Sequence, residues 1–137
     1  MSEVLVDTNI LVYSADQDSM FFERSRALLE SPDFELATTS KDIAELLVVL
    51  TKSTGYNLDN QLALEVLDGI RRNMRIIYPD QKSLDILSGL IRLYDPKGLR
   101  IHDMEIIAIS LAHDINLVAT FNVKDFKSVN EIKLLDL

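Results

Sequence analysis

Short apolar runs alternate along the chain with longer stretches in which apolar residues recur at helical spacing. Strands are predicted at about residues 3–6, 35–38, 75–78, 116–120 and 132–135, and helices at about 20–31, 39–50, 58–72, 80–94 and 102–113. Neighbouring parallel strands need a crossover connection, and a helix is the usual one. The alternation therefore predicts an α/β fold in which helices cover both faces of a mostly parallel sheet.

The chain is long enough for one domain and too short for two. Its 137 residues fall within the usual range of about 100–200 residues, so we expect residues 1–137 to form a single unit. An acid, Glu3, stands where a signal peptide carries basic residues, and no apolar run approaches the roughly 18 residues of a membrane span. We therefore expect a cytoplasmic protein that does not enter a membrane.

Several classes of site are excluded by what the sequence lacks. No Cys is present, and His102 and His113 are the only histidines, so a zinc site has too few ligands. Neither GxGxxG nor GxxxxGK[ST] occurs, which removes support for the two common nucleotide-binding loops. A net charge of −8 opposes attraction of nucleic acid by the protein as a whole. Any nucleic-acid role must therefore come from a local site.

Three carboxylates stand where solvation alone does not explain them. Asp7 directly follows the first predicted strand, Glu45 is the only charge between residues 43 and 51 of an apolar helix, and Asp103 begins a later helix. Each also has a structural explanation: Asp7 as a turn residue or helix N-cap, Glu45 as an edge glutamate in water, and Asp103 as an acid favoured by the helix dipole. Ligands of parallel sheets bind beyond the carboxyl ends of the strands, which is where these acids would converge.

Two further polar residues follow the strand predicted at 116–120. Asn122 and Asp125 lie just beyond that strand, where a turn explains them as well as a site does. Carboxylates that converge repel one another unless a cation neutralises them. Mg²⁺ or Mn²⁺ suits a set of Asp, Glu and Asn oxygens without His or Cys, and such ions activate water for attack on phosphodiesters. The pattern therefore favours a metal-dependent site for phosphodiester chemistry.

At these residues the sequence resembles the PIN-domain family, in particular the small VapC-type toxins. Four segments match the family's pattern in order, namely VLVDTNILVY, TTSKDIAELL, IHDMEIIAISLA and LVATFNVKDF. The resemblance implies a three-layer α/β/α sandwich and an endoribonuclease that depends on Mg²⁺ or Mn²⁺. By motif position it makes Asp7, Glu45 and Asp103 the catalytic acids and metal ligands.

The same motifs assign supporting roles to small polar residues that accompany the acids. Two follow the first acid, one precedes the glutamate helix and one precedes the fourth site; in order, they are Thr8, Asn9, Ser40 and Thr120. The fourth acidic position falls on Asn122, which departs from an all-acidic pattern, although Asp125 stands three residues further on. Both residues are therefore candidate metal ligands, and the number of ions, one or two, stays open.

The resemblance also implies partners. Proteins of this type act on RNA, form homodimers and are held inactive by an antitoxin protein that covers the acidic site. Two other roles within the family stay open, a PIN-type RNA-processing nuclease without an antitoxin and a non-catalytic PIN-like interaction domain. The three acids argue against the second, because an inactive site gains nothing from carboxylates that repel one another.

Two unrelated folds also place an acid after their first strand. A haloacid-dehalogenase-like phosphatase needs a second Asp two residues after the first, and Asn9 stands there. A response-regulator receiver expects adjacent acids at the end of its first strand, whereas Thr8 and Asn9 follow Asp7. Both alternatives are therefore disfavoured.

Overall fold

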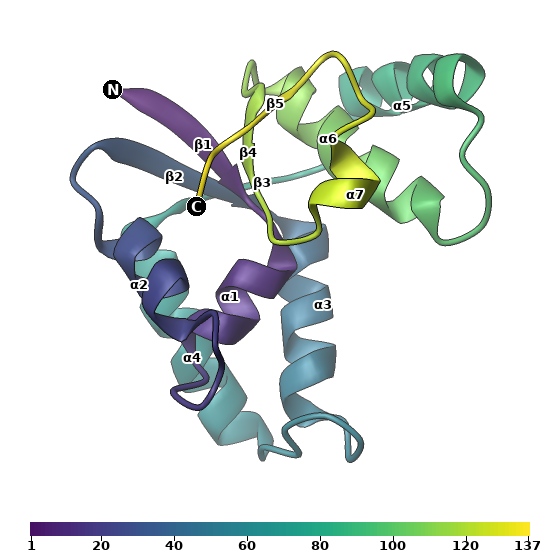
Figure 1. Ribbon diagram of the computed structural model, residues 1–137. Helices are drawn as coiled ribbons and strands as arrows, with labels where there is room; N and C mark the ends of the chain where they lie inside the picture. Colours follow the sequence, from purple (N-terminus) through teal and green to yellow (C-terminus); the bar gives the residue numbers. More distant parts are fainter.

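Five strands form one parallel sheet at the centre of the molecule (Figure 1). The computed structural model describes all 137 residues. In spatial order the strands are β3 (Arg75–Ile77), β2 (Phe34–Thr39), β1 (Ser2–Val6), β4 (Leu117–Ala119) and β5 (Lys133–Leu134). Every neighbouring pair is parallel, which confirms the predicted sheet.

Seven helices accompany the strands. They are α1 (Thr8–Ser14), α2 (Phe22–Glu30), α3 (Ser40–Thr51), α4 (Asn60–Asn73), α5 (Gln81–Tyr94), α6 (Arg100–Ala112) and α7 (Val123–Phe126). The five predicted helices are all present as α2 to α6, and their ends differ from the predicted ones by at most two residues. None of the seven is long and apolar enough to cross a lipid bilayer.

Helix α1 was not predicted from the sequence. Its residues Ile10, Leu11 and Val12 are all buried, so the helix shows no alternation of polar and apolar faces. Asp7 is its N-cap, and the Asp7 carboxylate accepts a hydrogen bond from the backbone N–H of Thr8. The interpretation of Asp7 as a helix cap is therefore confirmed.

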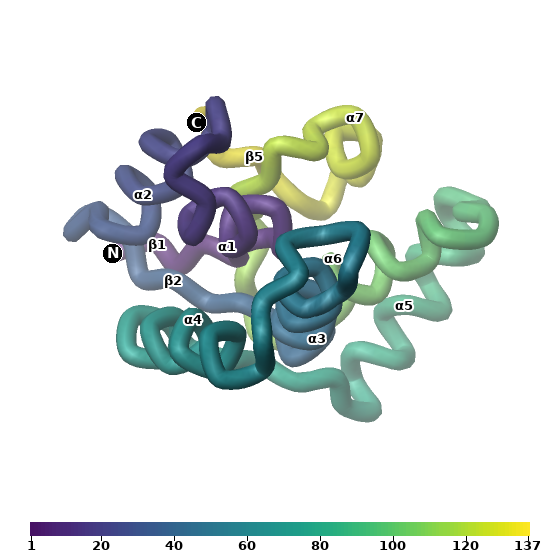
Figure 2. The backbone as a smooth tube through the Cα atoms, turned by 90° about the horizontal axis from the view of Figure 1, so that it is seen from below, coloured from purple at the N-terminus to yellow at the C-terminus, as the bar shows by residue number.

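Two apolar cores lie on the two faces of the sheet. The alternation of side chains along β1 divides them: Val4 and Val6 pack among residues of α1 to α4, whereas Leu5 packs among residues of α5 to α7. All three side chains are fully buried, as expected for the central strand of a parallel sheet covered on both faces. Figures 1 and 2 show α1 to α4 grouped on one side and α5 to α7 on the other, which confirms the three-layer α/β/α sandwich.

The strand order places a topological switch point between β1 and β4. From β1 the sheet continues through β2 and β3 on one side and through β4 and β5 on the other. In open parallel sheets the crevice at such a point, outside the carboxyl ends of the strands, is the usual ligand site. Asp7 follows β1, the start of α3 follows β2 and Thr120 follows β4, so the predicted acids gather at this crevice.

Candidate active site

Asp7 lies at the switch point and is held by three neutral donors. The carboxylate is only 6% exposed. Its Oδ1 accepts from the backbone N–H of Thr8 at 2.8 Å, and its Oδ2 accepts from the Thr120 hydroxyl at 2.8 Å and from the Asn9 amide at 3.3 Å. No cation balances its charge, because Asp7 forms no ion pair with Lys or Arg.

Asn9 and Thr120 join the start of α1 to the end of β4. The Asn9 amide also donates to the Thr120 hydroxyl oxygen at 3.2 Å, and the Asn9 carbonyl accepts from the backbone N–H of Phe121 at 3.2 Å. The Thr120 oxygen accepts a further bond from the backbone N–H of Asn122 at 3.0 Å. Both residues therefore fix the Asp7 carboxylate from the two sides of the switch point.

A second carboxyl, Asp42, lies directly behind this network, and sequence reasoning did not include it in the site. Asp42 forms a capping box with Thr39 at the start of α3. Asp42 is 0% exposed, and its Oδ1 accepts from Thr8 through the backbone N–H at 3.1 Å and the hydroxyl at 2.7 Å. Burial and the negative charge of Asp7 raise the pKa of Asp42 to about 8.

Glu45 reaches the network through the Thr8 hydroxyl, which lies 3.1 Å from Glu45 Oε2. Although its neighbours along α3 are apolar, Glu45 is exposed, as the explanation as an edge glutamate requires. The Thr8 hydroxyl carries one proton and faces two carboxyl groups. Because the raised pKa of Asp42 favours its protonated form at neutral pH, the Asp42 O–H can donate to the Thr8 hydroxyl oxygen while the Thr8 proton is donated to Glu45.

Asp103 lies in the first turn of α6, as the helix-dipole explanation requires. It also interacts electrostatically with the other acids. Its pKa is raised to about 6, first by partial burial and then by the negative charges of Asp7 and Asp125, with a smaller contribution from Glu45. The nearby cation of Arg100 opposes this rise. Asp103 therefore belongs electrostatically to the same site, although it shares no hydrogen bond with Asp7.

Asn122 and Asp125 form a pair at the start of α7. The Asn122 amide donates to Asp125 Oδ2 at 2.6 Å, and Asn122 occupies the N-cap position without a side-chain capping bond. Asp125 is held from the other side, because Arg100 donates to its backbone carbonyl at 2.9 Å. The negative charge of Asp125 raises the pKa of Asp103, and the backbone N–H of Asn122 donates to the Thr120 hydroxyl oxygen.

A cleft of about 510 Å³ opens beside the acids along α3. It is lined by Thr8, Ser40, Lys41, Ala44, Glu45, Val48, Val49 and His102. Ser40 therefore borders the site but makes no hydrogen bond to its acids. A separate hollow of about 380 Å³ between α1, α2 and α4 contains none of the predicted site residues.

The residues present suit a hard divalent cation. The carboxylates around the crevice are Asp7, Asp42, Glu45, Asp103 and Asp125, and none of them forms an ion pair with Lys or Arg. Oxygen ligands without thiolates or imidazoles are those that Mg²⁺ and Mn²⁺ prefer. No three of these carboxylates lie close enough together to hold a metal ion in this arrangement. This spacing is expected of like charges that repel one another without a cation between them.

Comparison with known proteins identifies the family. The model of the PIN domain matches residues 4–132. This chain belongs to the PIN-domain family. The resemblance seen in the sequence motifs is therefore confirmed, and the motif residues Asp7, Glu45, Asp103 and Asn122 all fall within the matched range. No curated protein sequence matches this PIN domain.

Solved structures with the same fold include VapBC toxin–antitoxin proteins. A chain of VapBC2 from Rickettsia felis, crystallised with a promoter DNA fragment, superposes with a TM-score of 0.75 at 22% identity over 97% of both chains. A chain of VapBC-1 from nontypeable Haemophilus influenzae gives 0.72 at 19% identity, over 98% of this chain and 97% of the other. VapC20 of Mycobacterium tuberculosis, a toxin that cleaves the sarcin-ricin loop, gives 0.69 at 14% identity, over 91% and 94%. These likenesses show the same fold over nearly the whole chain.

Proposed function

We propose that this PIN domain is a divalent-metal-dependent endoribonuclease, the toxin of a VapBC-type pair. The observation that carries the proposal is the group of acids without cationic partners at the switch point of the sheet, with Asp7 fixed by neutral donors. A protein keeps such a repelling group when a ligand of opposite charge completes it. The fold shared with VapC toxins supports the same class of activity.

The proposed metal ligands are Asp7, Glu45 and Asp103, with Asp125 or Asn122 at the fourth position. Bound Mg²⁺ or Mn²⁺ would supply an activated water and neutralise charge on the phosphodiester. The contribution of the chain is orientation: Thr120 and Asn9 hold Asp7, and Thr8 ties Glu45 to Asp42. Asp42 is fully buried, so we assign it to the support of Thr8 and not to the ion.

The proposed substrate and partners are supported by the structural neighbours and by the charge of the chain. VapC20 is described as a toxin that cleaves the sarcin-ricin loop, which favours RNA as the substrate here. Several neighbours are toxin–antitoxin complexes, and a chain with a net charge of −8 suits an antitoxin with a basic segment. We further propose a homodimer and a single domain over residues 1–137. A small neighbouring reading frame with a basic tail would favour the toxin over an RNA-processing nuclease.

Incubation of the purified protein with labelled single-stranded RNA and matched DNA tests the function. We expect cleavage of the RNA with Mg²⁺ or Mn²⁺ and none with EDTA, because the acids cannot position a phosphodiester without the cation. Protein carrying Asp7→Asn, purified in the same way, controls for contaminating nucleases. Folded protein that binds Mn²⁺ but cleaves no RNA would leave the non-catalytic interaction domain as the role.

Calorimetric titration with Mn²⁺ distinguishes the two candidates for the fourth position. If Asp125 is the ligand, Asp125→Asn should weaken binding roughly tenfold, because a neutral amide replaces a full negative charge near the ion. If Asn122 faces the ion instead, Asn122→Asp should tighten binding, because it adds a negative charge there. Asp68→Asn, an exposed acid of α4, is the matched control and should leave the affinity unchanged. Unchanged affinity in both variants would remove α7 from the metal site and leave three acids for one ion.

A further inference from the structure

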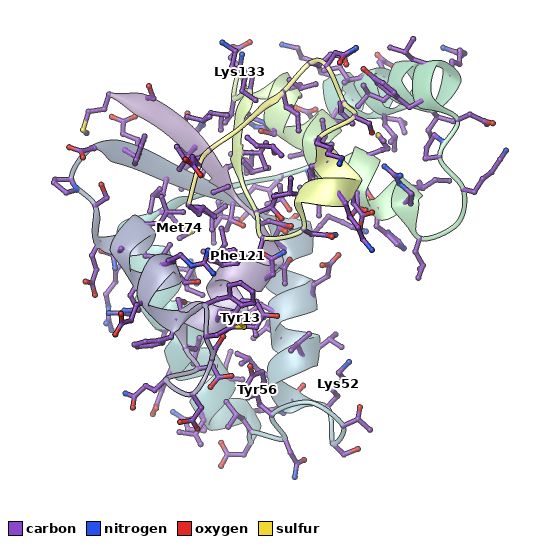
Figure 3. All side chains as sticks on the ribbon, viewed as in Figure 1. Tyr13, Lys52, Tyr56, Met74, Phe121 and Lys133 are labelled. Atoms are coloured by element: carbon purple, nitrogen blue, oxygen red, sulfur yellow. The ribbon has the colours of Figure 1, made fainter.

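Three aromatic rings form a shelf beside the acidic centre. Tyr13 of α1, Phe21 before α2 and Phe121 after β4 lie with ring centroids 5.0 Å apart for Tyr13 and Phe21, 4.5 Å for Phe21 and Phe121, and 6.0 Å for Tyr13 and Phe121. All three side chains are only partly buried. Figure 3 shows Phe121 next to Tyr13, at the loop where β4 passes into α7.

Arg24 of α2 rests on this shelf. Its guanidinium carbon lies 5.0 Å from the ring centroid of Phe21 and 5.2 Å from that of Phe121, a cation–π arrangement found at no other arginine of the chain. Arg24 is exposed and forms no ion pair or hydrogen bond within the protein. The rings therefore hold the cation while its N–H donors stay free for an anion.

The shelf is joined to the acids through consecutive residues. The Thr120 hydroxyl donates to Asp7, and the next residue, Phe121, donates its backbone N–H to Asn9. Tyr13 stands four residues after Asn9 on α1, so the two side chains lie on the same face of that helix. The shelf thus begins one residue after Thr120 and one helical turn after Asn9, both of which hold Asp7.

Three other cations of the chain are already engaged. Lys41 pairs with Glu105 at 3.1 Å, Lys97 pairs with Asp95 at 3.1 Å, and Arg100 donates to the backbone of Asp125. An acidic protein that binds a polyanion needs cations placed where the strand runs. Arg24 meets this need, because its stacked guanidinium loses little freedom when it binds a phosphate.

We propose that Arg24, held by Phe21 and Phe121, binds a backbone phosphate of the RNA next to the acidic centre. This inference rests on the proposed ribonuclease function and adds a binding residue on the α2 side of the site. Because a phosphate contact carries no sequence information, Arg24 contributes affinity and register, not base choice. Arg26, two residues along α2, pairs with Glu30 at 2.6 Å and provides a matched arginine without the shelf.

Fluorescence anisotropy with short labelled single-stranded RNA tests the proposal. All proteins carry Glu45→Gln to prevent cleavage, and binding is measured with Mn²⁺ at several salt concentrations. We expect Arg24→Gln to weaken binding severalfold, equally for U-rich and A-rich RNA, and to reduce the slope of log affinity against log salt by about 0.7, the value for one contact to a single strand. Arg24→Lys should keep most of the slope, and Arg26→Gln should match the parent.

Each other outcome overturns the assignment. An Arg24→Gln protein with the affinity and slope of Arg26→Gln shows that the arginine only packs on the rings. A loss that depends on base sequence without a change in slope identifies stacking of bases. RNA cleavage by the parent protein, measured in parallel, separates the two proposals. If the parent cleaves RNA but Arg24→Gln changes neither the binding affinity nor the salt slope, the proposed function stands and this inference fails.

Discussion

Glu45→Gln is expected to abolish metal-dependent RNA cleavage, with a loss of at least about a hundredfold, and to leave the fold intact. A metal site that loses a charged ligand gives up several kcal/mol of transition-state stabilisation, and each 1.4 kcal/mol corresponds to roughly tenfold in rate. Glu45 is exposed and its only hydrogen bond in the network is with Thr8, so its neutralisation should cost little stability. Single-turnover cleavage and thermal melting measure the two effects.

Asp7→Asn and Asp103→Asn should give comparable losses of cleavage. Asn is as good an N-cap as Asp, so we expect Asp7→Asn to keep the start of α1. The three donors to Asp7 bind its two carboxylate oxygens, however, and the Asn side chain offers only one acceptor oxygen. Melting curves therefore have to accompany that variant. Asp68→Asn serves as the control acid, and cleavage at the parental rate in a double variant at Asp7 and Asp103 would refute the site.

The free energy of unfolding is expected to fall as the pH rises from about 4 to about 8 in buffer with EDTA. Asp103 and Asp42 have folded-state pKa values of about 6 and about 8, above the value of 3.8 for an unperturbed Asp. The folded state then holds protons that the unfolded state has released, so stability decreases with pH across this window. The proton on the buried Asp42 contributes roughly 1.4 kcal/mol per pH unit, and the half-buried Asp103 contributes less because solvent screens its charge.

The contributions of Asp42 and Asp103 can be separated because the two carboxyl groups titrate over different pH ranges in the folded state. Between pH 6 and pH 8 the fall belongs to Asp42, so Asp42→Asn should flatten it, while Asp103→Asn should flatten the fall only below about pH 6. Urea unfolding at pH 5, 6, 7 and 8 measures both, with Asp68→Asn as control. A free energy of unfolding of the parent that rises between pH 6 and pH 8 would contradict the raised pKa of Asp42.

Added Mn²⁺ should stabilise the parent more than Asp7→Asn, because the ion binds the folded acids.

Much of the fold follows from local patterns in the sequence. The first and third strands are short runs with β-branched apolar residues, SEVLV and RII, and the capping box of Thr39 and Asp42 fixes the start of α3 to within one residue. The position of the acids beyond the strands then follows from the parallel order. Helix α1 escaped prediction because its seven residues are mostly buried and carry no polar face.

The burial of Asp42 had no local signal. A capping box is ordinarily a surface feature, and here the group that covers Asp42 is Thr8, 34 residues earlier in the chain. The exposure of Glu45 could not be predicted from its apolar neighbours either, because these neighbours are not all buried: Val48 is 58% exposed beside the cleft. The burial of Asp42 arises where Thr8 of α1 packs on the start of α3, whereas Glu45 and Val48 lie on a face of α3 that stays exposed. The pattern along α3 alone describes neither property.

The junctions at the carboxyl edge leave almost no room for change in length. One residue, Asp7, separates β1 from α1, and β2 passes into α3 with none between them. Because each inserted residue turns a helix by about 100°, one extra residue before α3 would swing Glu45 away from Thr8. The connections that follow α3 and α5, residues 52–59 and 95–99, are longer and join one helix to the next without a strand. Fusion tags, loop grafts and inserted reporter segments therefore belong there, and relatives of this protein should differ in length at those places before they differ at the acids.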